Sequence, residues 1–92
     1  QTTLLEQNHP NPFNNQTTFS YTLASQSKVS IVVYDIFGRE VVSLFEGFKN
    51  EGSYNQSWSG LDKDSRQAAS GIYFYKIKTK TEAITKKMVF SK

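Results

Sequence analysis

Cysteine is absent from this chain of 92 residues. Its absence excludes a disulfide framework, a thiol nucleophile and a thiolate metal site, and leaves the redox compartment open. No apolar run approaches the roughly eighteen residues that a membrane-spanning helix requires. Residues 1–6 contain neither the basic region nor the apolar stretch of a signal peptide, and no initiator Met precedes them. We therefore expect a piece of a longer protein, without a membrane span of its own.

Histidine is nearly absent as well, because His9 is the single one. A histidine metal site or a catalytic triad needs partners held in fixed geometry, and His9 stands between Asn8 and Pro10, which favours a turn residue. Asp62 and Asp64 could offer oxygens to Ca²⁺, but the further spaced carboxylates and the glycine of a calcium loop are missing. The eight acidic residues form no informative pair for glycoside hydrolysis. The sequence indicates a non-catalytic protein without a metal or cofactor.

The length suits a single domain, near the lower end of what folds unaided. A domain of this size buries only about 60–65% of the surface that its unfolded chain exposes, so its margin of stability is small. Seven Phe, five Tyr and one Trp supply large buried areas per residue. Aromatic side chains are therefore expected to make up much of a small core.

Apolar and polar side chains alternate along several short segments, and no helical period occurs. In residues 17–23, for example, Phe19, Tyr21 and Leu23 share one face and hydroxyl side chains share the other. Turn-forming residues separate the segments at regular spacing, which predicts a single all-β, immunoglobulin-like antiparallel sandwich of about seven strands. The expected strands are 4–7, 17–23, 29–34, 40–45, 53–59, 72–80 and 83–90, and residues 24–28, 47–52 and 60–70 are expected to be turns or loops.

Pro10 and Pro12 each fix φ and remove a backbone donor, and they bias the residues before them towards extended geometry. Residues 8–15 are therefore predicted to be stiff and extended. We divide the chain accordingly into an extended linker or lead-in segment over residues 1–15 and a β-sandwich over residues 16–92.

Two glycines, Gly38 and Gly71, lie next to strand ends. Gly38 can take the positive φ that a tight hairpin requires, and the Asp35 carboxylate is expected to accept backbone N–H bonds in the same turn. Gly71 ends the long polar connection and directly precedes the strand expected over residues 72–80.

The net charge is +3, and the positive charge gathers near the C-terminus. A basic strip can attract nucleic acid or an anionic membrane, but no interleaved exposed aromatics or phosphate-cradling glycine loop accompany these lysines. A solvated strand face, with Lys protecting a sheet edge, is the favoured interpretation. The lysines are Lys76, Lys78, Lys80, Lys86, Lys87 and Lys92.

Four sequence motifs follow one another in a fixed order and end at the C-terminus. They are Asn-x-Pro-Asn-Pro-Phe at 8–13, Val-x-Ile-x-Val-Tyr-Asp-x-x-Gly-Arg-Glu-Val from residue 29, Ser-Gly-Ile-Tyr-Phe-Tyr-Lys at 70–76 and Thr-Lys-Lys-Met-Val-x-x-Lys at 85–92. Together they resemble the C-terminal sorting domain of the type IX secretion system of Bacteroidetes and relatives, over residues 4–92. One difference is the long loop, where the family carries Asp-Gly after the Trp and this chain has Ser59 and Gly60 before Leu61 and Asp62.

The resemblance implies a non-catalytic sorting signal that directs a folded N-terminal cargo through the outer-membrane translocon, so that the cargo is secreted or anchored at the cell surface. It implies the translocon, its shuttle proteins and a surface sortase as partners, with cleavage at or before Gln1. The implied recognition residues are Pro10, Asn11, Pro12, Asp35, Gly38, Gly71, Lys86 and Lys87.

The last strand suggests how a partner could bind. At a sheet edge it would offer backbone groups for strand addition by a receptor. Lys86 and Lys87 point to opposite faces of this strand, so one of them would lie on the outer face as a charged contact.

Two other functions stay open. The strand segments also resemble the immunoglobulin-like domain of flagellar hook-capping proteins, which is an assembly scaffold. A carbohydrate-binding accessory module of a secreted hydrolase would need an exposed coplanar aromatic pair, either Tyr34 with Phe37 or Phe74 with Phe48.

Overall fold

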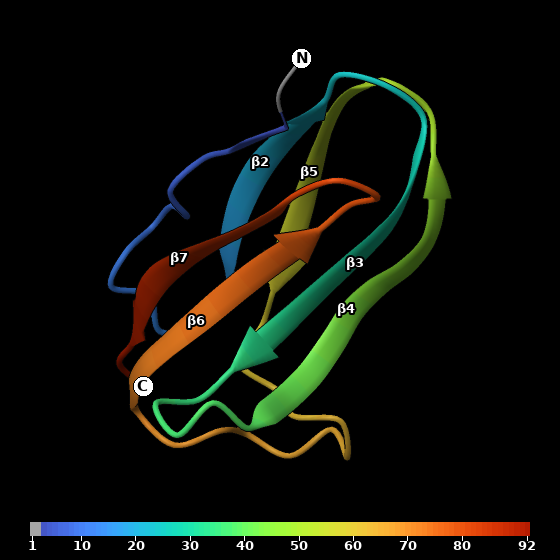
Figure 1. Ribbon diagram of the computed structural model, residues 1–92. Helices are drawn as coiled ribbons and strands as arrows, with labels where there is room; N and C mark the ends of the chain where they lie inside the picture. The colour runs from blue at the N-terminus through green and yellow to red at the C-terminus, as the bar shows by residue number, and fades with distance from the viewer. Residues whose placement is uncertain (1–2) are drawn as a thin grey trace.

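The computed structural model describes residues 3–92, and the regular secondary structure there is entirely β. Two antiparallel sheets pack face to face, one in the order β1-β2-β5 and the other in the order β4-β3-β6-β7 (Figure 1). The fourth strand lies beside the third, as C′ lies beside C in immunoglobulin domains. The strands are β1 (Leu4–Leu5), β2 (Thr17–Leu23), β3 (Ser27–Tyr34), β4 (Glu40–Lys49), β5 (Gly52–Trp58), β6 (Gly71–Lys78) and β7 (Ala83–Phe90). The predicted seven-stranded sandwich is confirmed.

Side-chain alternation explains why these segments form strands. In β2 every second side chain is buried, and in β6 the buried side chains are Tyr73, Tyr75 and Ile77. The side chains between them face outward, because successive residues of a strand point to opposite faces of the sheet. Within residues 3–92, no helix is long and apolar enough to span a membrane.

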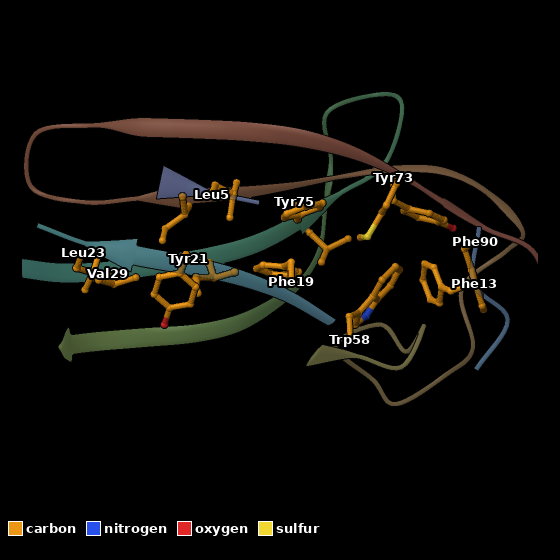
Figure 2. Close-up of a cluster of buried hydrophobic side chains, with 14 residues drawn as sticks. Leu5, Phe13, Phe19, Tyr21, Leu23, Val29, Trp58, Tyr73, Tyr75 and Phe90 are labelled. Carbon is orange, nitrogen blue, oxygen red and sulfur yellow. The ribbon is translucent and has the colours of Figure 1, made fainter. Parts of the chain in front are cut away.

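The core is aromatic at one end, as Figure 2 shows. Phe13 stacks on Phe90 with ring centroids 4.9 Å apart, and the Trp58 ring lies 5.7 Å from Phe13 and 5.3 Å from Tyr73. The Trp58 indole N–H donates to the Leu61 carbonyl at 2.9 Å, so the polar atom of the ring is satisfied.

The loop predicted over residues 47–52 is wrong in its extent, because only Asn50 and Glu51 lie outside the strands. Strand β4 continues to Lys49, with Gly47 opposite Val29 of β3. The Phe45 ring covers Gly47, since a Cβ added there would lie 3.4 Å from the ring. The Lys49 ammonium in turn lies 4.6 Å from the centre of the Phe45 ring. An aromatic side chain that covers a glycine in a strand compensates for the missing Cβ, and this packing carries β4 past the glycine.

The N-terminal segment (residues 3–15) packs on the sandwich. Leu5 pairs with Tyr21 of β2, and Phe13 is only 2% exposed. The Tyr75 hydroxyl donates to the Glu6 carbonyl at 2.7 Å, and burial raises the pKa of Tyr75 to about 12. The division of the chain at residue 15 stays a prediction, and residues 1–2, with the expected cleavage junction, lie outside the described residues.

Candidate recognition surface

The Pro10–Pro12 stretch is held by a small buried polar network. The Asn8 amide donates to Thr17 Oγ1 at 2.9 Å and to the Pro10 carbonyl at 3.2 Å. The Thr17 hydroxyl donates to the same carbonyl at 2.8 Å, and both Asn8 and Thr17 are buried. Both peptide bonds that precede the prolines are cis. Because buried polar side chains need their partners, this network fixes the path of the predicted recognition residues.

From Asn11 onward, the N-terminal segment runs along the outer edge of β7. The Val89 N–H donates to Asn11 Oδ1 at 2.9 Å, and the Phe13 N–H donates to the Val89 carbonyl at 3.1 Å. The Ser91 N–H then donates to the Phe13 carbonyl at 2.8 Å. Phe13 and Phe90 form a parallel bridge, so the segment acts as a short additional strand. Asn11 is therefore bonded to Val89 of the same chain, at the strand edge where a receptor strand was expected to bind.

The N-terminal segment restricts where a partner strand could add to the edge of β7. A side-chain bond from Gln7 to the Lys87 carbonyl, 2.7 Å long, extends the covered edge back to the middle of β7. A partner strand could therefore pair only with the first half of β7 unless the N-terminal segment left. Met88 and Phe90 are fully buried, so removing the end of the chain would also remove core side chains.

The β3–β4 turn is built around Asp35. Its Oδ1 accepts the N–H groups of Phe37 and Arg39 at 2.9 and 3.0 Å, and its Oδ2 accepts the Arg39 Nε–H at 3.0 Å. Gly38 has φ of +81°, the conformation predicted for it. Burial acts to raise the pKa of Asp35, but these hydrogen bonds and the Arg39 charge outweigh it and lower the pKa.

The long β5–β6 loop contains the same turn. Asp62 Oδ1 accepts the N–H groups of Asp64 and Arg66 at 2.9 and 3.0 Å, and Ser65 takes φ of +61° in the place of Gly38. The second turn is bonded to β4 just after the first turn, because the Lys63 N–H donates to the Val41 carbonyl at 3.1 Å. The Asp62 carboxylate thus organises backbone, and no group of three or more metal-ligating side chains occurs in residues 3–92. The pattern Asp-x-x-(Gly/Ser)-Arg was a signal for this second turn that the strand analysis missed.

Strand register shows which predicted residues come together. Tyr34, next to Asp35, pairs with Phe74 near the start of β6, and Gly71 pairs with Phe90 at the end of β7. The Asp35 turn, Gly71 and the C-terminus therefore share one end of the sandwich, and Phe13 brings Pro12 to the same end (Figure 1).

The two predicted lysines lie apart from that end. Lys87 stands opposite Phe74 on the outer face of the four-stranded sheet, as predicted for one lysine of the pair. Lys86 stands opposite the fully buried Tyr75 and shares the core-facing side of β7 with Met88. It is half-buried, which suits a side chain whose apolar stem covers the core margin.

The aromatic pairs required for a sugar-binding module do not form. Phe48 stands opposite Lys28 and Phe74 opposite Tyr34, so these rings are about 20 Å apart along β3. No ring contact joins Tyr34 to Phe37 in the described part of the chain, and Phe37 instead lies 5.0 Å from the Arg39 guanidinium.

Two solved structures from Porphyromonas gingivalis share the fold. The crystal structure of dimeric latent PorU superimposes with a TM-score of 0.77 at 22% identity, over 98% of this chain and 9% of that one. PorZ, described as an essential bacterial surface component of the type-IX secretion system, superimposes with a TM-score of 0.61 at 16% identity, over 98% of this chain and 11% of that one. The chain thus spans about a tenth of the length of either protein. No curated protein matches.

The family comparison covers almost the whole chain. The family model described as the secretion system C-terminal sorting domain matches residues 8–91. This range begins at the buried Asn8 and includes all of β7. The match includes the proline segment, both Asp-centred turns and the final strand. The chain therefore belongs to the family of secretion system C-terminal sorting domains.

Proposed function

We propose that this chain is the sorting signal of a longer secreted protein and directs a folded cargo, attached at its N-terminus, through the type IX outer-membrane translocon. The observation that carries the proposal is the family match over residues 8–91. The cargo then reaches the cell surface or the medium. The sorting role is a binding role, because the family is in general non-catalytic.

The fold supports a signal that is read as a folded surface. Met88 and Phe90 of the last strand are core residues, and the N-terminal segment closes over the strand edge. A receptor that reads this domain therefore meets a closed sandwich and not a loose C-terminal tail. Without cysteine, the fold does not depend on oxidation before or during transit.

The partners that we propose are the translocon, its shuttle proteins and a surface sortase. Pro10, Asn11 and Pro12, the Asp35–Gly38 turn and Gly71 gather at one end of the sandwich, which makes that end the candidate recognition surface. Lys87 would add a contact on the adjoining sheet face, and Lys86 one at the core margin. The hook-cap-like scaffold and the sugar-binding module are less favoured, because neither predicts the family match and the aromatic pairs of the latter do not form.

The test fuses residues 1–92 to a folded fluorescent reporter with an export signal, in a host that has the type IX machinery. The expected result is reporter on the surface or in the medium, and periplasmic reporter in an otherwise identical host without the translocon. Truncation of the last strand is a poor control because it removes core residues. Periplasmic reporter in both hosts, with the domain folded, would contradict the proposal.

A further inference from the structure

The two outer faces of the sandwich differ in chemistry. On the three-stranded sheet, neutral side chains pair across β2 and β5 in a hydrogen-bonded ladder. Thr18 bonds Ser57 at 2.9 Å, and Ser20 bonds Asn55 at 2.7 Å. A third rung joins the hydroxyls of residues 22 and 53 at 3.1 Å. Strands β2 and β5 carry no charged residue, and the side chains of the ladder bond one another.

The outer face of the four-stranded sheet carries aromatic and basic side chains instead. Register places Tyr34, Phe74 and Lys87 in one row across β3, β6 and β7. The next two rows contain Lys76 and Lys78, at alternate positions of β6. Phe74, Tyr34 and Lys76 are partly buried, so a partly exposed aromatic pair lies next to a group of three lysines.

The three lysines lack ion-pair partners among the described residues. The ion pairs of residues 3–92 are Arg39 with Asp35, in the turn, and Lys28 with Glu46, 3.9 Å apart at the far end of the sheet. Like charges that stand close together raise the energy of the free domain. Carboxylates from outside the chain would relieve this repulsion.

The margins of the face distinguish a protein from a membrane. Asp35, paired with Arg39, and Glu40 border the aromatic row, and Glu46, paired with Lys28, borders the opposite end. A uniformly anionic bilayer laid on the face would meet the Glu40 carboxylate, which has no ion-pair partner among residues 3–92, and would gain little from Arg39 and Lys28, whose charges are already paired. A protein surface can place its own acids over the lysines only, which is the basis of electrostatic specificity. Shallow hollows beside Phe74 and beside Lys78 offer places for side chains of such a partner.

We propose that the outer face of the four-stranded sheet docks an acidic segment of a partner protein, with carboxylates on Lys76, Lys78 and Lys87 and an apolar side chain on the Tyr34–Phe74 row. This inference rests on the proposed sorting function and identifies a second recognition surface. Lys76, Lys78 and Phe74 lie outside the recognition residues that the sequence predicts.

The test compares two double variants of the reporter fusion with the same change in net charge. The variant Lys76→Gln with Lys78→Gln removes two charges from the proposed face, and Thr22→Glu with Ser57→Glu adds two negative charges to the neutral face. Losing two interfacial charge contacts is expected to lower surface delivery about tenfold, while the control pair stays near wild type. Thermal unfolding of each purified domain confirms that both variants fold.

A photoreactive benzoylphenylalanine at position 74 tests for contact directly, with position 55 as the control. The expected result is a protein adduct at position 74 that disappears in the Lys76→Gln, Lys78→Gln background. Sedimentation of the wild-type domain with vesicles of equal parts phosphatidylglycerol and phosphatidylcholine, dependent on these lysines, would overturn the proposal in favour of a membrane.

The outcomes separate this inference from the sorting role. Normal delivery of both double variants, or an equal loss in both, overturns the docking face while the wild-type fusion still establishes sorting. A wild-type fusion that stays in the periplasm overturns the sorting function and the docking face together.

Discussion

The side-chain oxygen of Asn11 accepts a hydrogen bond from the Val89 N–H at 2.9 Å, and so joins residues 78 positions apart in the chain. The carboxamide takes the place that a neighbouring strand would occupy at the edge of β7. An edge covered in this way is protected from unwanted pairing with other chains. The asparagine of the proline motif therefore has a structural role within the domain.

Replacing Asn11 with Ala is expected to destabilise the domain by about 1 kcal/mol, the usual net value of one hydrogen bond. The measurement is urea unfolding, together with hydrogen exchange of the Val89 amide, whose protection should fall. Asn14→Ala is the matched control, since Asn14 is an exposed neighbour in the same segment. Unchanged protection of Val89 would show that Asn11 does not hold the edge.

Gly60 is expected to be the glycine least tolerant of a side chain. An added Cβ would lie 2.6 Å from the Phe90 ring, and φ is +78°, so Gly60→Ala combines a steric clash with backbone strain. Gly38→Ala carries the strain alone, because φ is +81° and nothing lies within 4 Å. The strain costs about 1–2 kcal/mol, and the clash should add a comparable amount at Gly60. Equal losses in chemical unfolding of the two variants would contradict this packing.

Phe13 tests whether the N-terminal segment belongs to the folded unit. The side chain is 2% exposed and stacks on Phe90, so Phe13→Ala should cost about 3–5 kcal/mol. A small domain has about 5–15 kcal/mol in total, so unfolding should begin at much lower denaturant concentration. Phe48→Ala is the control, because Phe48 is 71% exposed and should change stability by less than about 0.5 kcal/mol. A similar, small effect of both variants would place residues 3–15 outside the domain.

Asp35 should make the free energy of unfolding of the domain depend on pH in the acidic range. Its pKa in the folded domain is lower than its ordinary value of 3.8, so the unfolded chain binds the proton more tightly. The stability that the charged carboxylate contributes is therefore complete above the unfolded pKa, and is lost as pH falls through the lower folded pKa.

The measurement follows unfolding of the wild type and of Asp35→Asn from neutral pH to below 3. The two curves should converge as the pH falls, because the amide cannot titrate. Asp64→Asn is the control for the loss of an exposed carboxylate, since Asp64 donates its backbone N–H to Asp62 but its own carboxylate accepts no hydrogen bond from residues 3–92. Parallel wild-type and Asp35→Asn curves over the whole range would contradict the role given to Asp35.

The strands were predictable because their alternation is local. Burial of every second residue in β2 follows directly from Phe19, Tyr21 and Leu23. The extension of β4 was not predictable, because Gly47 is a turn signal and the covering ring of Phe45 overrides it only in the fold.

The candidate site was predictable only in part. The Asp35 carboxylate and the positive φ of Gly38 follow from local turn chemistry. The cover of β7 by Asn11 and Phe13 depends on contacts between the two ends of the chain, and strand periodicity carries no signal for such contacts. The docking face depends on cross-strand register, which brings Tyr34 and Lys87 to either side of Phe74.

The most direct measurement of the sorting role is the fraction of reporter that an added protease removes from intact cells, for the fusion of residues 1–92 in a host with the type IX translocon. Sorting by this domain predicts that most of the reporter is cleaved in that host, and that it is protected when the translocon is deleted. Reporter that stays protected in both hosts, while the purified fusion is folded, would contradict the account.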